Sequence, residues 1–430
     1  MVDKAQVRAA LEREVAAYRK ANPRSLELSA RAQRVLPGGT TRTTTFFPPF
    51  PPFQVRGEGC HMVDVDGNRR VDFINNYTSL ICGHAHPHIL KAAQEAAEGG
   101  TAFAAPTEYE VHLAELLCER VESLDLVRFT NSGTEATMAA MRLARAYTGQ
   151  PKVARFEGSY HGTHDYGTHP AAGVPDLVSE LVLDLPYNNV EGCREIVEKV
   201  GDDLAAIIVE PVLGAGGVIP AQPDFLEYLR SATTACGALL IFDEVQTLRL
   251  HPGGAQAIYG VSPDLSAFAK IIGGGFPVGA FGGSGEIMEI MHPVSGDISW
   301  GGTFNGNPVT AAAGLACMEM LTYSVISDLN ELGEYAMAGI RQAFDQAGIP
   351  GQVTGMGSLF NVHPTSEPIT DVHAVNRADP DLRRLFHFGL LNRGFFLSAR
   401  VSACLSTPMN RAEADGLIEA TVEIIQGLES

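Results

Sequence analysis

The sequence predicts an α/β protein with a mainly parallel sheet covered by helices, accompanied by a smaller α+β lobe. The first observation is that short, mostly apolar segments recur at residues 126–130, 153–156, 204–209, 238–245 and 265–270. Such runs suit strands that are buried on both faces of a sheet. The second is that helix-like sequence separates the runs, and this alternation is typical of a parallel sheet with right-handed crossovers.

Composition narrows the class of protein. The 430 residues are 45% hydrophobic and 19% charged, with a formal net charge of -19. This acidic balance argues against nucleic acid or an anionic membrane as a main partner. The seven cysteines are scattered without a C-x-x-C pair, which favours reduced thiols in a cytoplasmic protein. We expect neither a signal peptide nor a membrane span, because no apolar run approaches the roughly 20 residues of a span.

Three segments are predicted along the chain. Residues 1–82 hold a helix at 3–22, a pocket-lining loop and short strands, and are expected to join a small lobe. The N-terminal helix suits packing either on a partner subunit or on its own subunit. Residues 83–325 form the large domain, where strands and helices alternate. Residues 326–430 form a C-terminal small domain, in which long helical stretches alternate with short strands.

Two arginines are candidates for binding a substrate carboxylate. Arg42 is the lone cation in the irregular loop 40–53, which is rich in threonine, proline and phenylalanine. A segment this apolar is expected to line a pocket or a subunit interface. A guanidinium in it suits a carboxylate anchor, and a surface arginine is the alternative. Arg400, beside the last predicted strand, is the second candidate.

Two other patterns resemble parts of ligand-binding motifs but lack the residues that would complete those motifs. His84, His86 and His88 alternate, but Pro87 interrupts regular structure and no acid or cysteine completes a metal-binding set. We therefore expect no metal there. The glycine-rich segment 273–283 contains neither a dinucleotide-binding nor a P-loop motif, so we exclude both.

Small and hydroxyl-bearing residues follow the first predicted strand. Ser132, Gly133 and Thr134 stand at the start of a helix, whose free N–H groups and positive dipole end suit a phosphate. Plain N-capping by Ser132 or Thr134 is the alternative. Thr303, in a loop before a later helix, is a further candidate phosphate donor.

Four other polar residues stand at the ends of predicted strands: Tyr160, Glu210, Asp243 and Lys270. Ligands of open α/β sheets bind at the carboxyl ends of the strands. Tyr160 suits stacking on an aromatic ring. A buried acid needs a cationic partner, and a partly desolvated lysine serves as a nucleophilic amine. One acid and one amine in a single crevice suit pyridoxal phosphate (PLP), and a buried Asp243–Lys270 salt bridge is the alternative.

Short motifs follow one another in a fixed order along the chain. They are NSGTEA at 131–136, GSYHG at 158–162, VEP at 209–211, DEVQ at 243–246, KIIGGG at 270–275 and GTFNGNP at 302–308. In this order they resemble the class III PLP-dependent aminotransferases. Three further motifs, LPGG at 36–39, DVDGN at 64–68 and GHAHP at 83–87, resemble the glutamate-1-semialdehyde 2,1-aminomutase branch of that family.

The resemblance implies PLP fold type I and a homodimer with a shared active site. It places the Schiff base on Lys270 and the pyridinium contact on Asp243. It also implies further cofactor contacts, by Ser132, Gly133 and Thr134 at the phosphate, Tyr160 on the ring, Gln246 near the ring hydroxyl, Glu210 close to the cofactor, and Thr303 at the phosphate of the neighbouring subunit.

Two segments depart from the aminomutase pattern. The aminomutase typically continues its DEV motif as MTGFR, where this chain has QTLRL at 246–250. It also has SQFE before its last strand, where this chain has SARVS at 398–402. Because both segments lie around the substrate, the pattern looks closer to the β-amino-acid (β-phenylalanine type) aminotransferases.

The expected activity follows from that likeness. We expect transfer of an amino group from a β-amino acid with an aromatic or apolar side chain to a keto acid such as 2-oxoglutarate or pyruvate. The aminomutase reaction is the alternative. A PLP-binding protein without catalysis is a third possibility, from another class.

Overall fold

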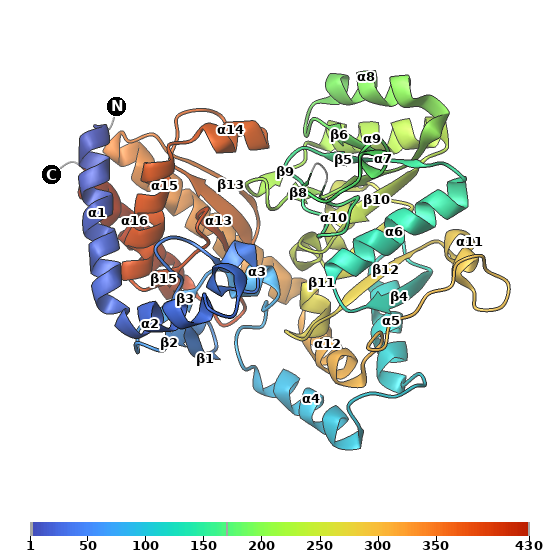
Figure 1. Cartoon of the computed structure of the whole chain (residues 1–430), viewed down its shortest axis with the longest axis horizontal. Helices are drawn as coiled ribbons and strands as arrows, with labels where there is room; N and C mark the ends of the chain where they lie inside the picture. The colour runs from blue at the N-terminus through green and yellow to red at the C-terminus, as the bar shows by residue number, and fades with distance from the viewer. Residues whose placement is uncertain (1–2, 169–170, 429–430) are drawn as a thin grey trace.

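The computed structural model describes residues 3–168 and 171–428, which form two lobes side by side (Figure 1). The larger lobe holds a seven-stranded sheet in the order β4-β12-β11-β10-β7-β5-β6. Its strands are β4 (Leu126–Thr130), β5 (Lys152–Phe156), β6 (Val182–Leu185), β7 (Leu204–Val209), β10 (Leu239–Asp243), β11 (Leu265–Ala269) and β12 (Gly279–Gly283). All neighbouring strands are parallel except where β12 is one of the pair. The predicted mainly parallel sheet is therefore confirmed.

Helices cover both faces of this sheet (Figure 1). On one face α6 (Gly133–Thr148) buries a stripe of small side chains, including Ala136 and Ala140, against strand residues such as Ile241. Spacings of three and four residues align such a stripe along one side of a helix. On the other face, α8 (Val190–Val200) and α9 (Pro223–Cys236) pack on the alternate strand residues, such as Phe242. The central strands are thus buried on both sides.

Strand β12 lies in the glycine-rich segment that the sequence did not predict to be a strand. The structure explains why glycine is needed there. A Cβ atom on Gly279 would lie 2.1 Å from the carbonyl oxygen of Ser132, and one on Gly282 would lie 2.3 Å from that of Leu126. Because neighbouring backbone passes this close, side chains are excluded, and the β-branched residues that usually mark a strand are missing.

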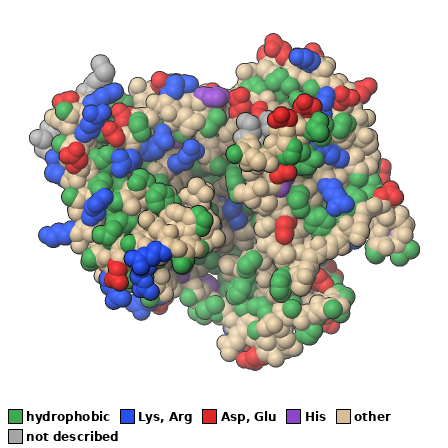
Figure 2. Space-filling model, in the orientation of Figure 1, with side chains coloured by type: hydrophobic (Ala, Val, Ile, Leu, Met, Phe, Trp, Pro, Cys, Tyr) green, Lys and Arg blue, Asp and Glu red, His purple; other side chains and the backbone are tan. Residues whose placement is uncertain are grey.

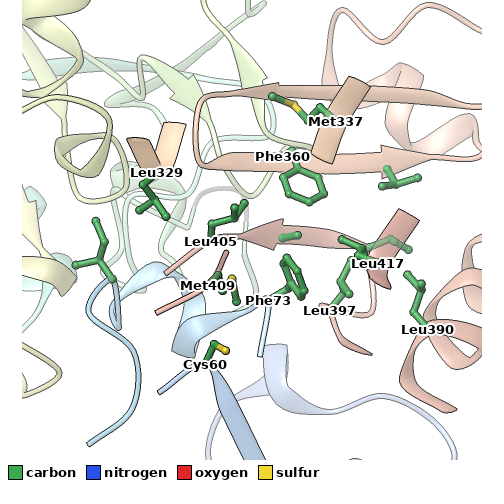
Figure 3. Packing of buried hydrophobic residues seen from close by; sticks show 14 of the residues in the cluster. Cys60, Phe73, Leu329, Met337, Phe360, Leu390, Leu397, Leu405, Met409 and Leu417 are labelled. Atoms are coloured by element: carbon green, nitrogen blue, oxygen red, sulfur yellow. The ribbon is translucent and has the colours of Figure 1, made fainter. Parts of the chain in front are cut away.

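The smaller lobe contains residues from both ends of the chain. One sheet has the order β1-β2-β3-β15 and another has the order β13-β14-β16. Their strands are β1 (Gln54–Glu58), β2 (His61–Asp64), β3 (Arg69–Asp72), β13 (Gln352–Met356), β14 (Leu359–His363), β15 (Phe395–Phe396) and β16 (Ser402–Cys404). Figure 3 shows Phe73 packed in one buried cluster with C-terminal residues such as Phe360, Leu397 and Leu417. The segment boundaries near residues 82 and 325 stay predictions.

Long helices surround these sheets. They are α1 (Lys4–Ala21), α2 (Pro23–Ala32), α13 (Tyr323–Ala347), α15 (Pro380–Asn392) and α16 (Arg411–Gln426). Helix α1 packs on α15 and buries Val7, Leu11 and Tyr18. The Tyr18 hydroxyl donates a hydrogen bond to the carbonyl of Phe50 at 3.0 Å. The N-terminal helix therefore packs on its own subunit, which was one of the two expectations.

The remaining elements connect the two lobes or cover their edges. Longer ones are α4 (Pro87–Gly99), α5 (Glu108–Arg120) and α12 (Pro308–Met320), which pack together beside β4. Short ones are η1 (Pro37–Gly39), η2 (Thr43–Thr45), α3 (Asn75–Thr78), α7 (Asp176–Ser179), η3 (Gly201–Asp203), β8 (Val212–Leu213), β9 (Ile219–Pro220), η4 (Thr247–Leu250), α10 (Gly254–Tyr259), η5 (Lys270–Gly273), α11 (Gly285–Met288), η6 (Glu289–Met291) and α14 (Val372–Arg377).

Among the described residues, no single helix is long and apolar enough to cross a membrane. Helices α12 and α13 pass that test only as a pair, by length and composition, and they are bent by 75° relative to each other. All seven cysteines are free thiols.

A buried ion pair ties the small lobe together. Arg70 Nη1 lies 2.5 Å from Asp64 Oδ2, and 5% and 0% of the two side chains are exposed. Arg70 Nε also donates to the carbonyl of Leu391 at 3.1 Å, so the pair joins the N-terminal strands to α15. Removing one partner leaves a buried charge uncompensated, which costs about 3–5 kcal/mol. We expect Asp64→Ala to lower the free energy of unfolding by about that amount.

Chemical denaturation measures this effect. The matched control is Glu367→Ala, which removes the partner of Arg377 from a pair whose side chains are 57% and 50% exposed. Exposed pairs contribute about 0–1 kcal/mol, so the control should change little. If the two variants lost equal free energy of unfolding, burial would not increase the contribution of the Arg70–Asp64 pair to stability.

Candidate active site

The loops that follow β4, β5, β7, β10 and β11 surround one cavity of about 350 Å³. The molecular surface is hollowed between the two lobes (Figure 2). Most of the predicted site residues line this cavity: Arg42, Gly133, Thr134, Tyr160, Glu210, Asp243, Gln246 and Lys270. Residues far apart in the sequence meet here because parallel strands end at the same edge of the sheet.

Asp243 ends strand β10 and is 4% exposed. Its Oδ2 lies 2.8 Å from Nδ1 of the buried His161, and its Oδ1 accepts a hydrogen bond from the backbone N–H of Val245 at 3.1 Å. Within the described part of the chain, Asp243 forms no ion pair with Lys270. The structure therefore does not contain the buried Asp243–Lys270 salt bridge that was the alternative interpretation of these two residues.

Lys270 directly follows β11, and its side chain reaches into the cavity. Its φ of 56° lies in the left-handed region, which is uncommon for a residue with a Cβ. Burial lowers the pKa of Lys270, while the charges of Asp243 and Glu210 act in the opposite direction. A lowered pKa increases the fraction of neutral amine, which is the nucleophilic and proton-accepting form.

Glu210 stands at the end of β7 and holds two loops. Its Oε1 accepts from the backbone N–H of Tyr160 at 2.8 Å, and its Oε2 accepts from that of Gly214 at 3.1 Å. Burial raises the pKa of Glu210 to about 7, although His161 lowers it and Asp243 raises it further. The Tyr160 side chain is 50% exposed, so its ring is available to a planar ligand in the cavity.

The start of α6 provides backbone donors to the cavity. Ser132 caps this helix, because its Oγ accepts from the backbone N–H of Glu135 at 3.2 Å, so the capping alternative holds for this residue. The N–H groups of Gly133 and Thr134 have no partner among the residues that the structure describes. A Cβ on Gly133 would lie 3.3 Å from the Cβ of Ala269, so the helix start approaches the end of β11 closely.

Arg42 lines a second cavity as well as the first. This apolar cavity has a volume of about 440 Å³, and Arg42, Asn76 and Tyr77 are common to both. Arg42 Nη1 donates to Asn76 Oδ1 at 2.9 Å, and its guanidinium lies 5.5 Å from the centre of the Tyr77 ring. The loop 40–53 therefore lines a pocket, which was one of the two roles predicted for it.

Three predicted residues line neither cavity: Ser132, Arg400 and Thr303. Arg400 is exposed, and its Nη1 donates to the carbonyl of Ala215 at 2.8 Å. Thr303 is exposed in the loop before α12. Thr303 was expected to reach the phosphate of a neighbouring subunit, so its position in one chain leaves that role a prediction.

The family follows from comparison with known proteins. Residues 47–381 match the family model described as aminotransferase class-III. The chain belongs to the class III aminotransferase family. A curated glutamate-1-semialdehyde 2,1-aminomutase from Methanothermobacter thermautotrophicus is 42% identical over 420 residues, which cover 95% of this chain and 100% of that protein. The resemblance inferred from the motifs is confirmed.

Solved structures agree with this class III aminotransferase assignment. An omega-transaminase from Sphaerobacter thermophilus is 45% identical, with a TM-score of 0.91 and coverage of 94% of this chain and 98% of that one. A β-phenylalanine aminotransferase from Variovorax paradoxus is 37% identical, with a TM-score of 0.93 and coverage of 98% of each chain. A transaminase with PLP bound is 36% identical, with a TM-score of 0.88 and coverage of 95% of this chain and 98% of that one. Fold type I and the PLP cofactor are confirmed.

The groups that line the cavity of this class III aminotransferase match the phosphate, ring nitrogen and aldehyde of PLP. The free N–H groups of Gly133 and Thr134, at a positive helix end, suit the phosphate. The Asp243 carboxylate suits a protonated ring nitrogen, and the amine of Lys270 suits covalent attachment to the aldehyde carbon. Each of these individual roles stays a prediction.

Three residues that shape the site were not predicted from the sequence: Asn76, Tyr77 and His161. His161 follows Tyr160 directly in the GSYHG motif, so its position beside a strand end was a usable signal. Asn76 and Tyr77 gave no such signal. They lie in a stretch from Asn75 to Thr78 with φ values of 49°, 49°, 56° and 75°, and residues with side chains rarely adopt these values in succession.

Proposed function

We propose that this class III aminotransferase moves an amino group from a β-amino acid with an aromatic or apolar side chain to a keto acid such as 2-oxoglutarate or pyruvate. The observation that carries the proposal is the apolar cavity beside the Lys270 cavity. Its lining includes Phe47, Phe53, Phe396 and Leu397. A cation, Arg42, stands where the two cavities meet, so one ligand could place its carboxylate there and its side chain among apolar groups.

The solved relatives support the same chemistry. The one at 45% identity is named an omega-transaminase, and the one at 37% is named a β-phenylalanine aminotransferase. Both likenesses extend over nearly the whole chain.

The residues supply the proton transfers that such a reaction needs. The chemistry that bound PLP supplies is an electron sink next to the amine-bearing carbon. The neutral amine of Lys270 would take a proton from that carbon and return one. Asp243 would hold a positive charge at the ring nitrogen of bound PLP, and His161 fixes the Asp243 carboxylate through Oδ2. Glu210 positions Tyr160 through its backbone N–H.

A second candidate is the aminomutase reaction. The names of the curated relatives favour it, since the matches at 40–42% identity are called glutamate-1-semialdehyde 2,1-aminomutase. Its substrate is a short amino aldehyde without an apolar side chain, which leaves the cavity of about 440 Å³ without an occupant. The segments 246–250 and 398–402 also depart from the aminomutase pattern.

One experiment separates the two candidates. The holoenzyme is offered α- and β-amino acids with pyruvate or 2-oxoglutarate, and separately glutamate-1-semialdehyde with no keto acid. We expect β-phenylalanine-type donors to be consumed only when a keto acid is present. Conversion of the semialdehyde at a higher kcat/KM, with no turnover of any β-amino donor, would establish the aminomutase instead.

The two arginines are proposed to divide the two substrates between them. The carboxylate of a β-amino acid lies one carbon further from the amine than that of an α-keto acid, so one fixed anchor cannot suit both. Arg42 stands at the junction of the cavities and is proposed to bind the β-amino acid carboxylate. Arg400 forms no ion pair within residues 3–168 and 171–428, and a single hydrogen bond holds it to Ala215. It is proposed to turn inward and bind the keto acid.

We therefore expect Arg42→Ala to raise the KM for the β-amino donor far more than that for 2-oxoglutarate, and Arg400→Ala to do the reverse. A charged hydrogen-bonded contact contributes about 1.5–3 kcal/mol, or roughly 10- to 150-fold in KM. Single-turnover kinetics measures each half-reaction alone. Arg377→Ala, at an exposed position outside both cavities, is the control. If both variants raised the KM equally in both half-reactions, the two arginines would not divide the two substrates between them.

The enzyme is also proposed to act as a cytoplasmic homodimer. Val111 and Phe304 are 49% and 59% exposed; Val111 lies beside the loop that carries Thr303, and Phe304 directly follows Thr303 in it. Exposed apolar side chains gathered on one face suit burial against a second subunit. In that arrangement Thr303 would contact the phosphate in the neighbouring subunit. Analytical ultracentrifugation tests the dimer, and a single-chain mass for the active enzyme would refute it.

A further inference from the structure

Three metal-ligating side chains converge outside both cavities. They are Cys60 in the turn between β1 and β2, His61 at the start of β2, and Glu413 in the first turn of α16. The Cys60 Sγ, a His61 ring nitrogen and a Glu413 carboxylate oxygen all lie within 4.8 Å of one another. Residues separated by more than 350 positions in the sequence thus meet at one point of the small lobe.

The spacing of these atoms suits a tetrahedral ion. Cys60 Sγ lies 3.4 Å from His61 Nδ1. A zinc ion bonded to sulfur at about 2.3 Å and to nitrogen at about 2.0–2.1 Å, with a tetrahedral angle between them, separates the two ligand atoms by about 3.5 Å. The two side chains therefore already stand at the separation that such an ion requires.

The surroundings leave the ligand atoms available. Cys60 is buried at the margin of the small-lobe core, as Figure 3 shows, while His61 and Glu413 are partly exposed. Glu413 uses one oxygen, Oε2, to accept from the backbone N–H of Asn410 at 2.8 Å. No hydrogen bond to its other oxygen is present in the described part of the chain.

The local charges favour a cation. The Glu413 carboxylate lies beside the Cys60 sulfur and the His61 ring. A bound divalent cation would compensate both a Cys60 thiolate and the Glu413 carboxylate, and these two negative charges exceed the single positive charge of Arg69.

We propose that Cys60, His61 and Glu413 bind a divalent ion of the zinc class, with water in the fourth position. On binding, the thiol proton of Cys60 leaves to solvent and a sulfur–metal bond forms, with no change of oxidation state. The ion would join the β1–β2 turn to the start of α16. It takes no part in amino transfer, because none of its ligands lines the Lys270 cavity.

The competing explanation is a plain S–H···N hydrogen bond between Cys60 and His61 with no metal. The test uses tag-free holoenzyme that has been dialysed against a chelator. Calorimetric titration with Zn²⁺ is expected to give one tight site per chain and a raised Tm, since an ion that binds only the folded state stabilises it. Co²⁺ is expected to give the intense visible bands of a tetrahedral site with a thiolate ligand.

Variants assign the site to these residues. Cys60→Ser and Glu413→Gln should each weaken Zn²⁺ binding at least about tenfold. Cys236→Ser, at a half-buried cysteine outside the cluster, should leave it unchanged. Glu413→Gln retains the helix cap, because glutamine at this position also reaches the N-cap N–H, so it reports on the ligand even if Cys60→Ser fails to fold. Absence of a stoichiometric site in the wild type, or unchanged binding by Glu413→Gln, would overturn the proposal.

Discussion

Lys270→Ala is expected to abolish amino transfer and leave a folded protein. The side chain lines the cavity and forms no ion pair in the described part of the chain, and Asp243 keeps its contact with His161 when the lysine is removed. Alanine has a Cβ like lysine, so the left-handed backbone at this position becomes no more strained than before. The variant loses both the nucleophilic amine and the proton-transfer group, and proton transfer alone contributes about 10²- to 10⁴-fold to the rate.

The measurements are single-turnover kinetics and mass spectrometry after borohydride reduction. Wild-type protein should carry PLP covalently on the peptide that contains residue 270, and the variant should carry none. Lys91→Ala is the control, because that lysine is 73% exposed on α4, far from the cavity lining. A reducible covalent adduct that persists in Lys270→Ala would place the attachment on another lysine.

The strand ends that carry Glu210, Asp243 and Lys270 could be predicted because each follows a mostly apolar run that stops at a charged residue. That pattern located Glu210, Asp243 and Lys270, which all line the same cavity. It works because buried parallel strands exclude polar groups until the chain reaches the edge of the sheet. The same rule fails for β12, where close backbone approach selects glycine and removes the apolar signal.

Other parts of the site depend on tertiary geometry that a linear pattern does not contain. Asn76 and Tyr77 form the junction of the two cavities through a left-handed backbone, and neither residue type predicts that conformation. A buried salt bridge to Lys270 was the alternative considered for Asp243, yet the side chain that contacts its carboxylate is His161, at 2.8 Å. The distance between 161 and 243 in the sequence gives no sign of that contact.

The direction of the Arg400 side chain was not predictable for a similar reason. Its sequence position beside the last strand is correct, because it immediately precedes Val401 and strand β16. Its side chain nevertheless points to the carbonyl of Ala215 and not into either cavity. A long side chain of this kind is placed by tertiary contacts, and a linear sequence pattern does not contain them.

Asp243→Asn is expected to slow amino transfer by about 10²- to 10³-fold, which corresponds to about 2.7–4 kcal/mol of transition-state stabilisation. The carboxylate is 4% exposed, and water therefore screens its charge weakly. Asparagine has nearly the same shape, and its side-chain oxygen can still accept from the Val245 N–H. The fold should therefore survive, and the loss should come from the missing negative charge opposite the ring nitrogen.

The expected signature is a fall in kcat for both half-reactions with smaller changes in KM, because the charge acts on the electron sink and not on either substrate carboxylate. Asp202→Asn, at an exposed acid far from the cavity, is the control and should keep wild-type rates. Rates within about tenfold of wild type for Asp243→Asn would mean that the ring nitrogen needs no buried anion, since removal of one preorganised electrostatic partner should cost more than that. Asp243 would then serve mainly to hold His161, whose Nδ1 lies 2.8 Å from its carboxylate.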